Sequence, residues 1–349
     1  MNQSFMNKIK SEKYFDHLYP GKATENAIYK AVFVHSDRWR YGDLYGLSYL
    51  HQYKYELEPF KQYPARSRPV TNRILYIIGD SFLADKILSG AFHAFDDVYF
   101  FDRRFPFGPV KLDSTKQNYL IMEFAERNLN GYSIGKTSEV RWTNKEIGTR
   151  ANLRTVPYSE KIPQPHTSII DRLSTILFNK DLSRNLELIL FDNKMVTPFK
   201  EAKASLNYRL FGRVANEVAV SSNKERLFLS LTVDTGSFQS AFRPKSAQAI
   251  DSMVHNLDEA AKYYSAIGFK QVFLSIIPNS VSIYDSGRMP YNHLLQRVEQ
   301  STHIPIISLF EAYKADRRNL FYKSDAHWNP SGLDVWVNKT NSVLNSTLY

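Results

Sequence analysis

The feature that most constrains the fold is a run of β-favouring apolar residues, Ile74-Leu75-Tyr76-Ile77-Ile78, which ends at the turn residues Gly79-Asp80-Ser81. A continuous run of this kind is typical of a strand that is buried on both faces of a parallel sheet. The spacing of apolar residues from Phe82 to Leu88 is compatible with a helix. We therefore predict a strand, a tight turn and a helix in this segment.

Strand-like and helix-like patterns continue to alternate along the chain. Apolar residues recur at three- and four-residue steps from Ile250 to Tyr264, and Gly268 supplies a stop for that helix. The alternation predicts an α/β fold, namely a three-layer α/β/α sandwich with a mainly parallel sheet. Further strands are predicted at 98–101, 119–124, 227–231, 272–277 and 304–309, and further helices at 291–298 and from 331 onward.

Two regions do not follow this alternation. Residues 1–70 form an aromatic-rich N-terminal segment that ends in a proline-marked linker, Tyr63 to Pro69, and we expect it to pack on the core. Residues 71–349 are expected to form one α/β domain with an insertion or subdomain at about 131–225, where prolines and polar stretches are scattered. The length allows either two average domains or one large domain with such an insertion.

Composition removes several classes of chemistry. The chain has no cysteine, which excludes disulfides, thiolate metal sites, iron–sulfur clusters and a cysteine nucleophile. The 9 histidines form no H-E-x-x-H or comparable pair, so we expect neither a metal nor a cofactor. The net charge is +10, but no block of five like charges exists, and we expect no nucleic-acid partner. The same positive field would attract an acidic polymer such as an anionic polysaccharide.

The sequence contains no membrane-spanning pattern. No window approaches the ~18 consecutive apolar residues of a transmembrane helix. Residues 1–19 are polar and charged and lack the apolar stretch of a secretory leader. These features predict a soluble protein without an export signal, unless a leader or anchor has been removed.

The first candidate for chemistry is Gly79-Asp80-Ser81, at the end of the first predicted strand. Active residues of open α/β sheets lie on loops at the carboxyl ends of strands. A serine at the following helix N-terminus would present its hydroxyl at that edge, and its own N–H could stabilise an oxyanion. The alternative is a helix N-cap, for which Asp and Ser are favoured residues, and the tripeptide alone favours that alternative.

The second candidate is Asp325-Ala326-His327-Trp328, on a loop before the last predicted helix. A hydroxyl nucleophile needs a base, and the base needs an orienting carboxylate on its other ring nitrogen. Asp325 and His327 can supply both from a single segment. The alternative is a surface or capping histidine beside a tryptophan that anchors the core.

Together the two motifs resemble those of the SGNH (GDSL-like) hydrolase superfamily over about 70–130 and 225–349. The most similar branch has a C-terminal Asp-x-His-Trp signature and includes the DHHW proteins and the alginate-type polysaccharide O-acetylation proteins. The resemblance implies a flavodoxin-like sheet, with Ser81 as nucleophile, His327 as general base and Asp325 as its orienter. It also implies an extracytoplasmic location and a membrane-bound acyl-donor partner, so we expect that a leader has been removed.

The sequence departs from that superfamily at the oxyanion hole. Family members place a Gly after the second strand and a Gly-x-Asn-Asp after the third. Gly108 follows the second predicted strand here, whereas Arg127 and Asn128 occupy the neighbourhood after the third. These three residues are therefore the candidates for oxyanion-hole or substrate-positioning roles. The alternative for Arg127 is a surface residue of a helix.

A competing nucleophile motif is Gly131-Tyr132-Ser133-Ile134-Gly135, which fits the G-x-S-x-G elbow of α/β-hydrolases. That elbow needs a strand directly before it, and the polar segment 126–130 precedes it instead. The overlapping phosphate-binding loop pattern has three residues between its glycines where four are needed. We interpret this segment as a surface turn and keep Ser133 as the alternative nucleophile.

The sequence therefore predicts a serine-dependent acyl-ester hydrolase or O-acyltransferase that works through an acyl-enzyme. The resemblance favours acetyl groups on a carbohydrate, and an acylated carbohydrate or a small ester is the expected substrate. The choice between water and a sugar hydroxyl as acceptor stays open. The alternative is a non-catalytic carbohydrate-binding or assembly protein on the same fold, which the missing Asn block and the 22 Tyr and 23 Phe residues favour.

Overall fold

The computed structural model of this chain describes residues 40–64, 70–84, 86, 88–103, 112–134 and 195–348. The chain divides into two compact units. Unit 1 comprises Met1–Glu56 and Ser159–Ala215, and unit 2 comprises Leu57–Tyr158 and Asn216–Tyr349. The loops that carry the candidate motifs belong to unit 2.

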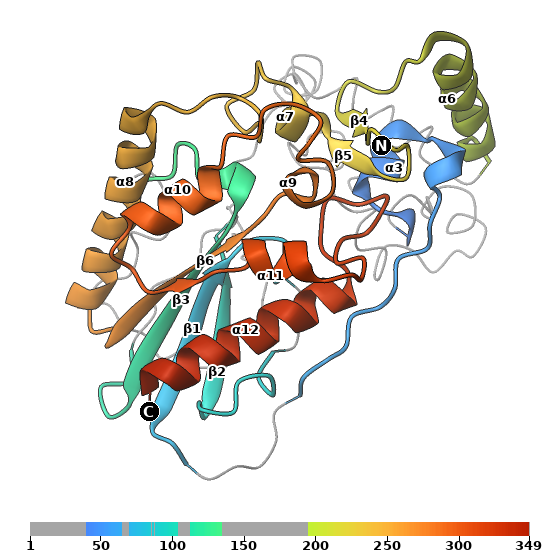
Figure 1. Ribbon diagram of the computed structural model, residues 1–349. Coiled ribbons are helices and arrows are strands. Elements are labelled where there is room, and N and C mark those ends of the chain that lie inside the picture. Colours follow the sequence, from blue (N-terminus) through green and yellow to red (C-terminus); the bar gives the residue numbers. More distant parts are fainter. Residues whose placement is uncertain are drawn as a thin grey trace, which may run out of the picture. The chain divides into compact units, whose positions relative to one another are not determined.

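Unit 2 is built on a parallel sheet with the strand order β2-β1-β3-β6-β7, which can be followed in Figure 1. Each neighbouring pair in this sheet is parallel. This order is that of flavodoxin-like doubly wound sheets, so the predicted α/β fold class is confirmed. The strands are β1 (Arg73–Gly79), β2 (Asp97–Asp102), β3 (Gln117–Ala125), β6 (Gln271–Ile277) and β7 (Ile306–Ile307).

Helices connect and cover these strands. The longest helices among the described residues are α8 (Ala247–Ala266) and α12 (Pro330–Leu348). A separate antiparallel pair is formed by β4 (Val218–Val220) and β5 (Leu227–Leu229). The other elements in the described part of unit 2 are η5 (Glu126–Asn128), α7 (Ser230–Val233), α9 (Ser280–Tyr284), α10 (Leu294–Ser301) and α11 (Phe310–Ala315).

The central strands are buried because helices cover both faces of the sheet. The indole N–H of Trp336, on α12, donates to the hydroxyl of Ser275 on one face, at 2.9 Å. On the other face, Tyr76 of β1 packs edge-to-face against Phe269, which packs against Tyr264 of α8. Every residue of β1 except Arg73 is buried, as expected for a strand covered on both sides.

Four predicted elements differ from the observed ones. Residues 81–84 form turns instead of the start of a helix, and residues 85 and 87 lie outside the described part. The helix predicted at 291–298 is α10, which begins at Leu294. The strand predicted at 304–309 pairs only over Ile306–Ile307, and the one predicted at 227–231 gives way to α7 after Leu229.

A close approach of two backbones fixes the start of α12. A Cβ placed on Gly332 would lie 2.2 Å from the carbonyl oxygen of Leu320 and 2.7 Å from the Cβ of Trp328. Neither neighbour is the flexible end of a side chain. Only glycine therefore lets α12 begin directly after the loop that carries His327.

Gly332→Ala is expected to lower the free energy of unfolding by about 1–3 kcal/mol, because the added methyl group forces the backbone of Leu320 away. Gly287→Ala is the matched control, since a Cβ at Gly287 would meet nothing within 4 Å. Urea unfolding of both variants measures the difference. Equal midpoints for the two variants would show that the contact at Gly332 costs nothing.

Unit 1 is described over residues 40–56 and 195–215, which contain α3 (Asp43–Ser48), η4 (His51–Tyr53) and α6 (Thr197–Phe211). The carboxylate of Glu201, on α6, accepts hydrogen bonds from the Tyr45 hydroxyl and the Lys54 amine and contacts His51 Nδ1. Burial alone would raise the pKa of Glu201, but these partners lower it. Polar contacts therefore hold α6 against α3 and η4.

Among the residues described, no helix combines the length and the apolar character that crossing a membrane requires.

Candidate active site

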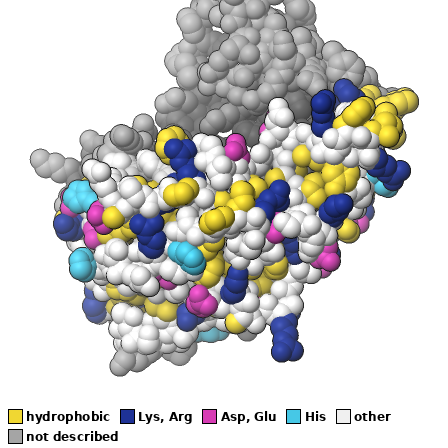
Figure 2. Space-filling view, turned by 45° about the horizontal axis from the view of Figure 1, so that its top comes forward, with side chains coloured by type: hydrophobic (Ala, Val, Ile, Leu, Met, Phe, Trp, Pro, Cys, Tyr) yellow, Lys and Arg dark blue, Asp and Glu magenta, His cyan; other side chains and the backbone are white. Residues whose placement is uncertain are grey.

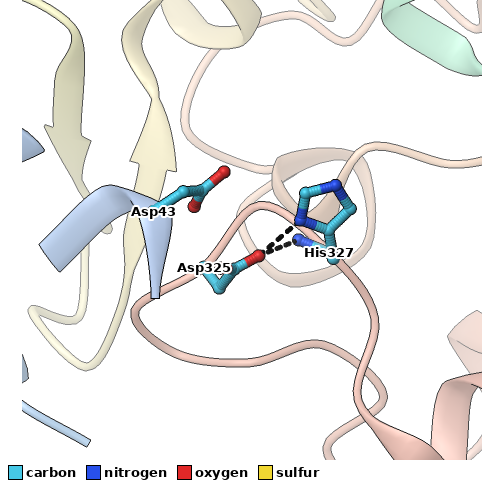
Figure 3. A group of neighbouring side chains, drawn as sticks. All are labelled: Asp43, Asp325 and His327. Atoms are coloured by element: carbon cyan, nitrogen blue, oxygen red, sulfur yellow. Dashed lines mark hydrogen bonds and ion pairs between the residues drawn. The ribbon is translucent and has the colours of Figure 1, made fainter. Parts of the chain in front are cut away.

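Ser81, His327 and Asp325 form a continuous chain of hydrogen bonds in unit 2. The Ser81 Oγ lies 2.8 Å from Nε2 of His327, and Nδ1 of His327 lies 2.6 Å from Oδ1 of Asp325. Figure 3 shows the second of these contacts, with the Asp325 carboxylate turned toward the imidazole. The first of these contacts joins segments that are 246 residues apart in the sequence. The structure brings the three predicted side chains together.

The one-residue spacing between Asp325 and His327 has a local cause. The backbone N–H of His327 donates to the same oxygen, Oδ1 of Asp325, at 2.8 Å. Asp side chains commonly accept the N–H two residues further on, which closes a tight turn. This turn holds the Asp325 carboxylate in place beside the imidazole of His327. Asp325 therefore orients both the backbone and the imidazole of His327.

Asp80 shapes the turn that carries Ser81. Its Oδ1 accepts the N–H of Phe82 at 3.0 Å, and its Oδ2 accepts the side-chain amide of Asn128 at 2.9 Å. Its carbonyl accepts the N–H groups of Leu83 and Ala84. Asp80 therefore caps this turn, and an Asp cap is what the N-cap interpretation predicted. The side chain of Ser81 does not cap the turn and contacts His327 instead.

The backbone N–H of Ser81 has no acceptor among the residues that the structure describes, although Asp80 and Phe82 on either side have one. An unpaired N–H beside the nucleophile is a donor that a developing oxyanion can use. The sequence predicts this N–H at a helix N-terminus. That prediction is wrong, because the donor lies in a turn that Asp80 closes.

Aromatic contacts join the two motifs. The Phe82 ring lies 4.8 Å from the ring of His327, measured between centroids, and packs edge-to-face against Trp328. The guanidinium of Arg127 lies 5.3 Å from the centroid of the same Phe82 ring. Arg127 is half-buried on η5 instead of a surface helix. The guanidinium of Arg127 and the imidazole of His327 therefore both lie beside the phenyl ring of Phe82.

Gly79 and Glu123 explain why the turn begins where it does. The N–H of Asp80 donates to Oε2 of Glu123 at 2.8 Å, and a Cβ on Gly79 would lie 2.5 Å from that oxygen. Burial, reinforced by the nearby Asp80 carboxylate, raises the pKa of Glu123 well above its usual range. A glycine is thus required for the buried carboxyl group to reach the backbone beside the nucleophile.

A second buried carboxyl group, Glu126, follows β3. Its Oε2 accepts the N–H of Asn279 and the hydroxyl of Ser282, each at 2.8 Å. Burial raises the pKa of Glu126 to about 7, against the opposing effect of these hydrogen bonds and of the charges on Arg127 and Lys245. Glu126 therefore fastens the end of β3 to the loop between β6 and α9.

The raised pKa of Glu126 predicts a pH-dependent stability. The folded state holds this proton up to about pH 7, whereas the unfolded chain releases it near 4.5. The contribution is therefore fully present below pH 4.5 and is lost as the pH rises to about 7. Glu126→Gln removes this contribution. As the pH rises from 4.5 to about 7, the free energy of unfolding of the wild type should therefore fall relative to that of the variant, by an amount on the order of 3 kcal/mol.

Urea titrations of wild type and Glu126→Gln across that pH range make the measurement. Glutamine keeps an oxygen for Asn279 and Ser282, so the comparison isolates the charge. A difference between the two proteins that does not change with pH would contradict this account of Glu126.

The remaining predicted site residues have separate positions. The side chain of Asn128 donates to Asp80 and so reaches the site through the turn of Ser81. Gly108 lies outside the described residues. Ser133 follows a turn and η5 with no strand directly before it, so the elbow context is not present. Sequence reasoning missed the role of Glu123, whose only signal was a charged residue near the end of a buried strand.

We compared the chain with models of protein families, with curated proteins and with solved structures, and none of them matches. The resemblance to SGNH hydrolases therefore stays a prediction that rests on the two motifs.

Proposed function

We propose that this protein is a serine-dependent acyl-ester enzyme of the SGNH type, with Ser81 as nucleophile, His327 as general base and Asp325 as its orienting carboxylate. The observation that carries the proposal is the unbroken contact from the Ser81 hydroxyl through the imidazole to the Asp325 carboxylate. Nucleophile, base and orienter within hydrogen-bond reach are the geometric signature of such catalysis.

The first half of the reaction follows from the proton positions. With Nδ1–H donated to Asp325, Nε2 of His327 is free to accept the proton of the Ser81 hydroxyl. The Ser81 oxygen attacks the ester carbonyl, and the electron pair moves onto the carbonyl oxygen. As the tetrahedral intermediate collapses, the leaving alkoxide takes the proton from Nε2, and the acyl group stays on Ser81.

The second half repeats the chemistry in reverse. His327 takes a proton from water or from an alcohol, whose oxygen attacks the acyl-enzyme, and then returns that proton to Ser81. Water as acceptor makes the protein an esterase, and a sugar hydroxyl makes it an O-acyltransferase. The oxyanion of both halves would be stabilised by the backbone N–H of Ser81, with Arg127 as a positive charge nearby.

The substrate class rests on the resemblance. Proteins of the Asp-x-His-Trp branch suggest an O-acetylated carbohydrate, a membrane-bound acyl-donor partner and an extracytoplasmic setting. Arg127 and Asn128 are proposed to position the substrate or its oxyanion, Asn128 through the carboxylate of Asp80. Gly108 is kept as a further candidate donor.

Labelling with a fluorophosphonate, followed by peptide mass spectrometry, tests the proposal. The reagent reacts with an activated serine, so the label is expected on the peptide that contains Ser81. The label should disappear in His327→Ala, which keeps the serine but removes its base. A label at Ser133 would point to an α/β-hydrolase-type elbow, and no label would favour a binding or assembly protein.

A further inference from the structure

A stripe of apolar side chains on unit 1 faces away from the contacts that hold its helix in place. We name this feature the α6 stripe, and it consists of Phe199, Leu206 and Leu210, which are 76%, 57% and 64% exposed. In a helix of 3.6 residues per turn, positions 199, 206 and 210 lie within one narrow sector. The three side chains therefore share one side of α6, with Lys203 between Phe199 and Leu206.

The opposite face of α6 makes the internal contacts of the unit. Glu201 receives the Tyr45 and Lys54 hydrogen bonds, and the Lys200 amine lies 3.3 Å from the Tyr49 hydroxyl. A helix on a globular core normally turns its apolar side inward and its polar side to water. In α6 this order is reversed, and among the residues that the structure describes the contacts with α3 and η4 leave the apolar side chains exposed.

The charges around the stripe have one sign. Lys203, Arg209 and Arg213 are exposed, and Glu201, the one acidic residue between 195 and 215, is buried against its partners. Figure 2 shows hydrophobic side chains beside Lys and Arg side chains at the right-hand end of the view, where Figure 1 places α6. An apolar face bordered by cations is complementary to a surface with an apolar interior and negative head groups.

We propose that the α6 stripe binds the surface of a bilayer that contains anionic lipids. Phe199, Leu206 and Leu210 would enter the boundary between head groups and acyl chains, while Lys203, Arg209 and Arg213 contact lipid phosphates. At 15 residues, α6 is about 22 Å long, which suits a helix that lies in the plane of the interface. The proposal does not depend on the catalytic function of Ser81.

Co-sedimentation of the full chain with vesicles tests this inference. Binding is expected to vesicles of phosphatidylcholine mixed with phosphatidylglycerol, to be much weaker to phosphatidylcholine alone, and to weaken as salt is raised. Phe199→Ser should reduce the partition coefficient about tenfold, as loss of one buried large apolar side chain implies. Lys203→Gln should reduce it about fivefold.

Matched controls are available on unit 2. Phe238 is 67% exposed, so Phe238→Ser removes a comparable phenyl group from another surface. Lys262→Gln removes an exposed cation from α8. Neither control should change vesicle binding, and unchanged circular dichroism would show that all four variants are folded.

Three results would overturn the inference. One is failure of the wild type to bind either kind of vesicle, and another is equal loss of binding in Phe199→Ser and Phe238→Ser. The third is a dimer in lipid-free solution that Phe199→Ser dissociates, because a second copy of the chain would then cover the stripe.

Discussion

Ser81→Ala and His327→Ala are each expected to reduce the turnover of an activated acetate ester by at least ~10⁴-fold. The nucleophile and its base act as one unit, so loss of either stops the formation of the acyl-enzyme. For the same reason, the double variant should be no slower than either single one. Spectrophotometric release of nitrophenol from p-nitrophenyl acetate measures all three.

Asp325→Asn should cause a comparable loss, about 10⁴-fold, because the amide favours the wrong tautomer of His327 without removing the ring. Ser133→Ala serves as the matched control and should retain full activity. Near wild-type turnover in any of the Ser81, His327 or Asp325 variants would remove the basis of the proposed mechanism.

Trp328→Ala is expected to lower the free energy of unfolding by about 3–5 kcal/mol. The side chain is fully buried between Phe82 and Trp336, and its indole N–H donates to the carbonyl of Phe82 at 3.1 Å. Removal leaves a large cavity between the Ser81 turn and the His327 loop. A loss of this size is a large part of the stability of an ordinary domain.

Trp328→Phe separates packing from hydrogen bonding, because it keeps an aromatic ring but leaves the carbonyl of Phe82 without its donor. Its cost should be about 1–3 kcal/mol. Phe238→Ala, at an exposed position, should stay within about 0.5 kcal/mol of the wild type. Guanidinium unfolding of the three variants decides the matter, and equal midpoints for Trp328→Ala and Phe238→Ala would refute the anchoring role.

Most of the sheet was predictable because its strands obey a simple rule. Strands buried on both faces need continuous apolar runs, and β1, β3 and β6 have them. The alternation with helices then fixed the fold class. The edge strand β7 was predicted too long, because only Ile306 and Ile307 pair with β6 and apolar residues beyond them are buried without pairing.

The turn after β1 shows why spacing alone is ambiguous. Phe82, Leu83 and Leu88 are all buried in the core, although residues 81–84 form turns and not a helix, so burial of apolar residues alone produced the helix-like pattern. The side chain of Asp80 takes the N–H of Phe82, which competes with helical hydrogen bonding. Such competition depends on tertiary partners, here including Asn128, and no local pattern reveals it.

The candidate triad was predictable because each of its parts has a local signature, and the contacts between the parts required only that two loops meet. The buried carboxyl groups were not predictable in the same way. Glu126 is satisfied by Asn279, which lies 153 residues further along the chain. Only the folded chain identifies such a partner.

Trapping of the acyl-enzyme tests the central claim most directly. The wild type would be mixed with p-nitrophenyl acetate, quenched in acid during turnover, digested and analysed by mass spectrometry. We predict that one acetyl group is found on Ser81 and that none is found in His327→Ala. Steady ester turnover with the acetyl group on another residue, or with no acetylated peptide and no effect of Ser81→Ala, would contradict the proposed role of Ser81.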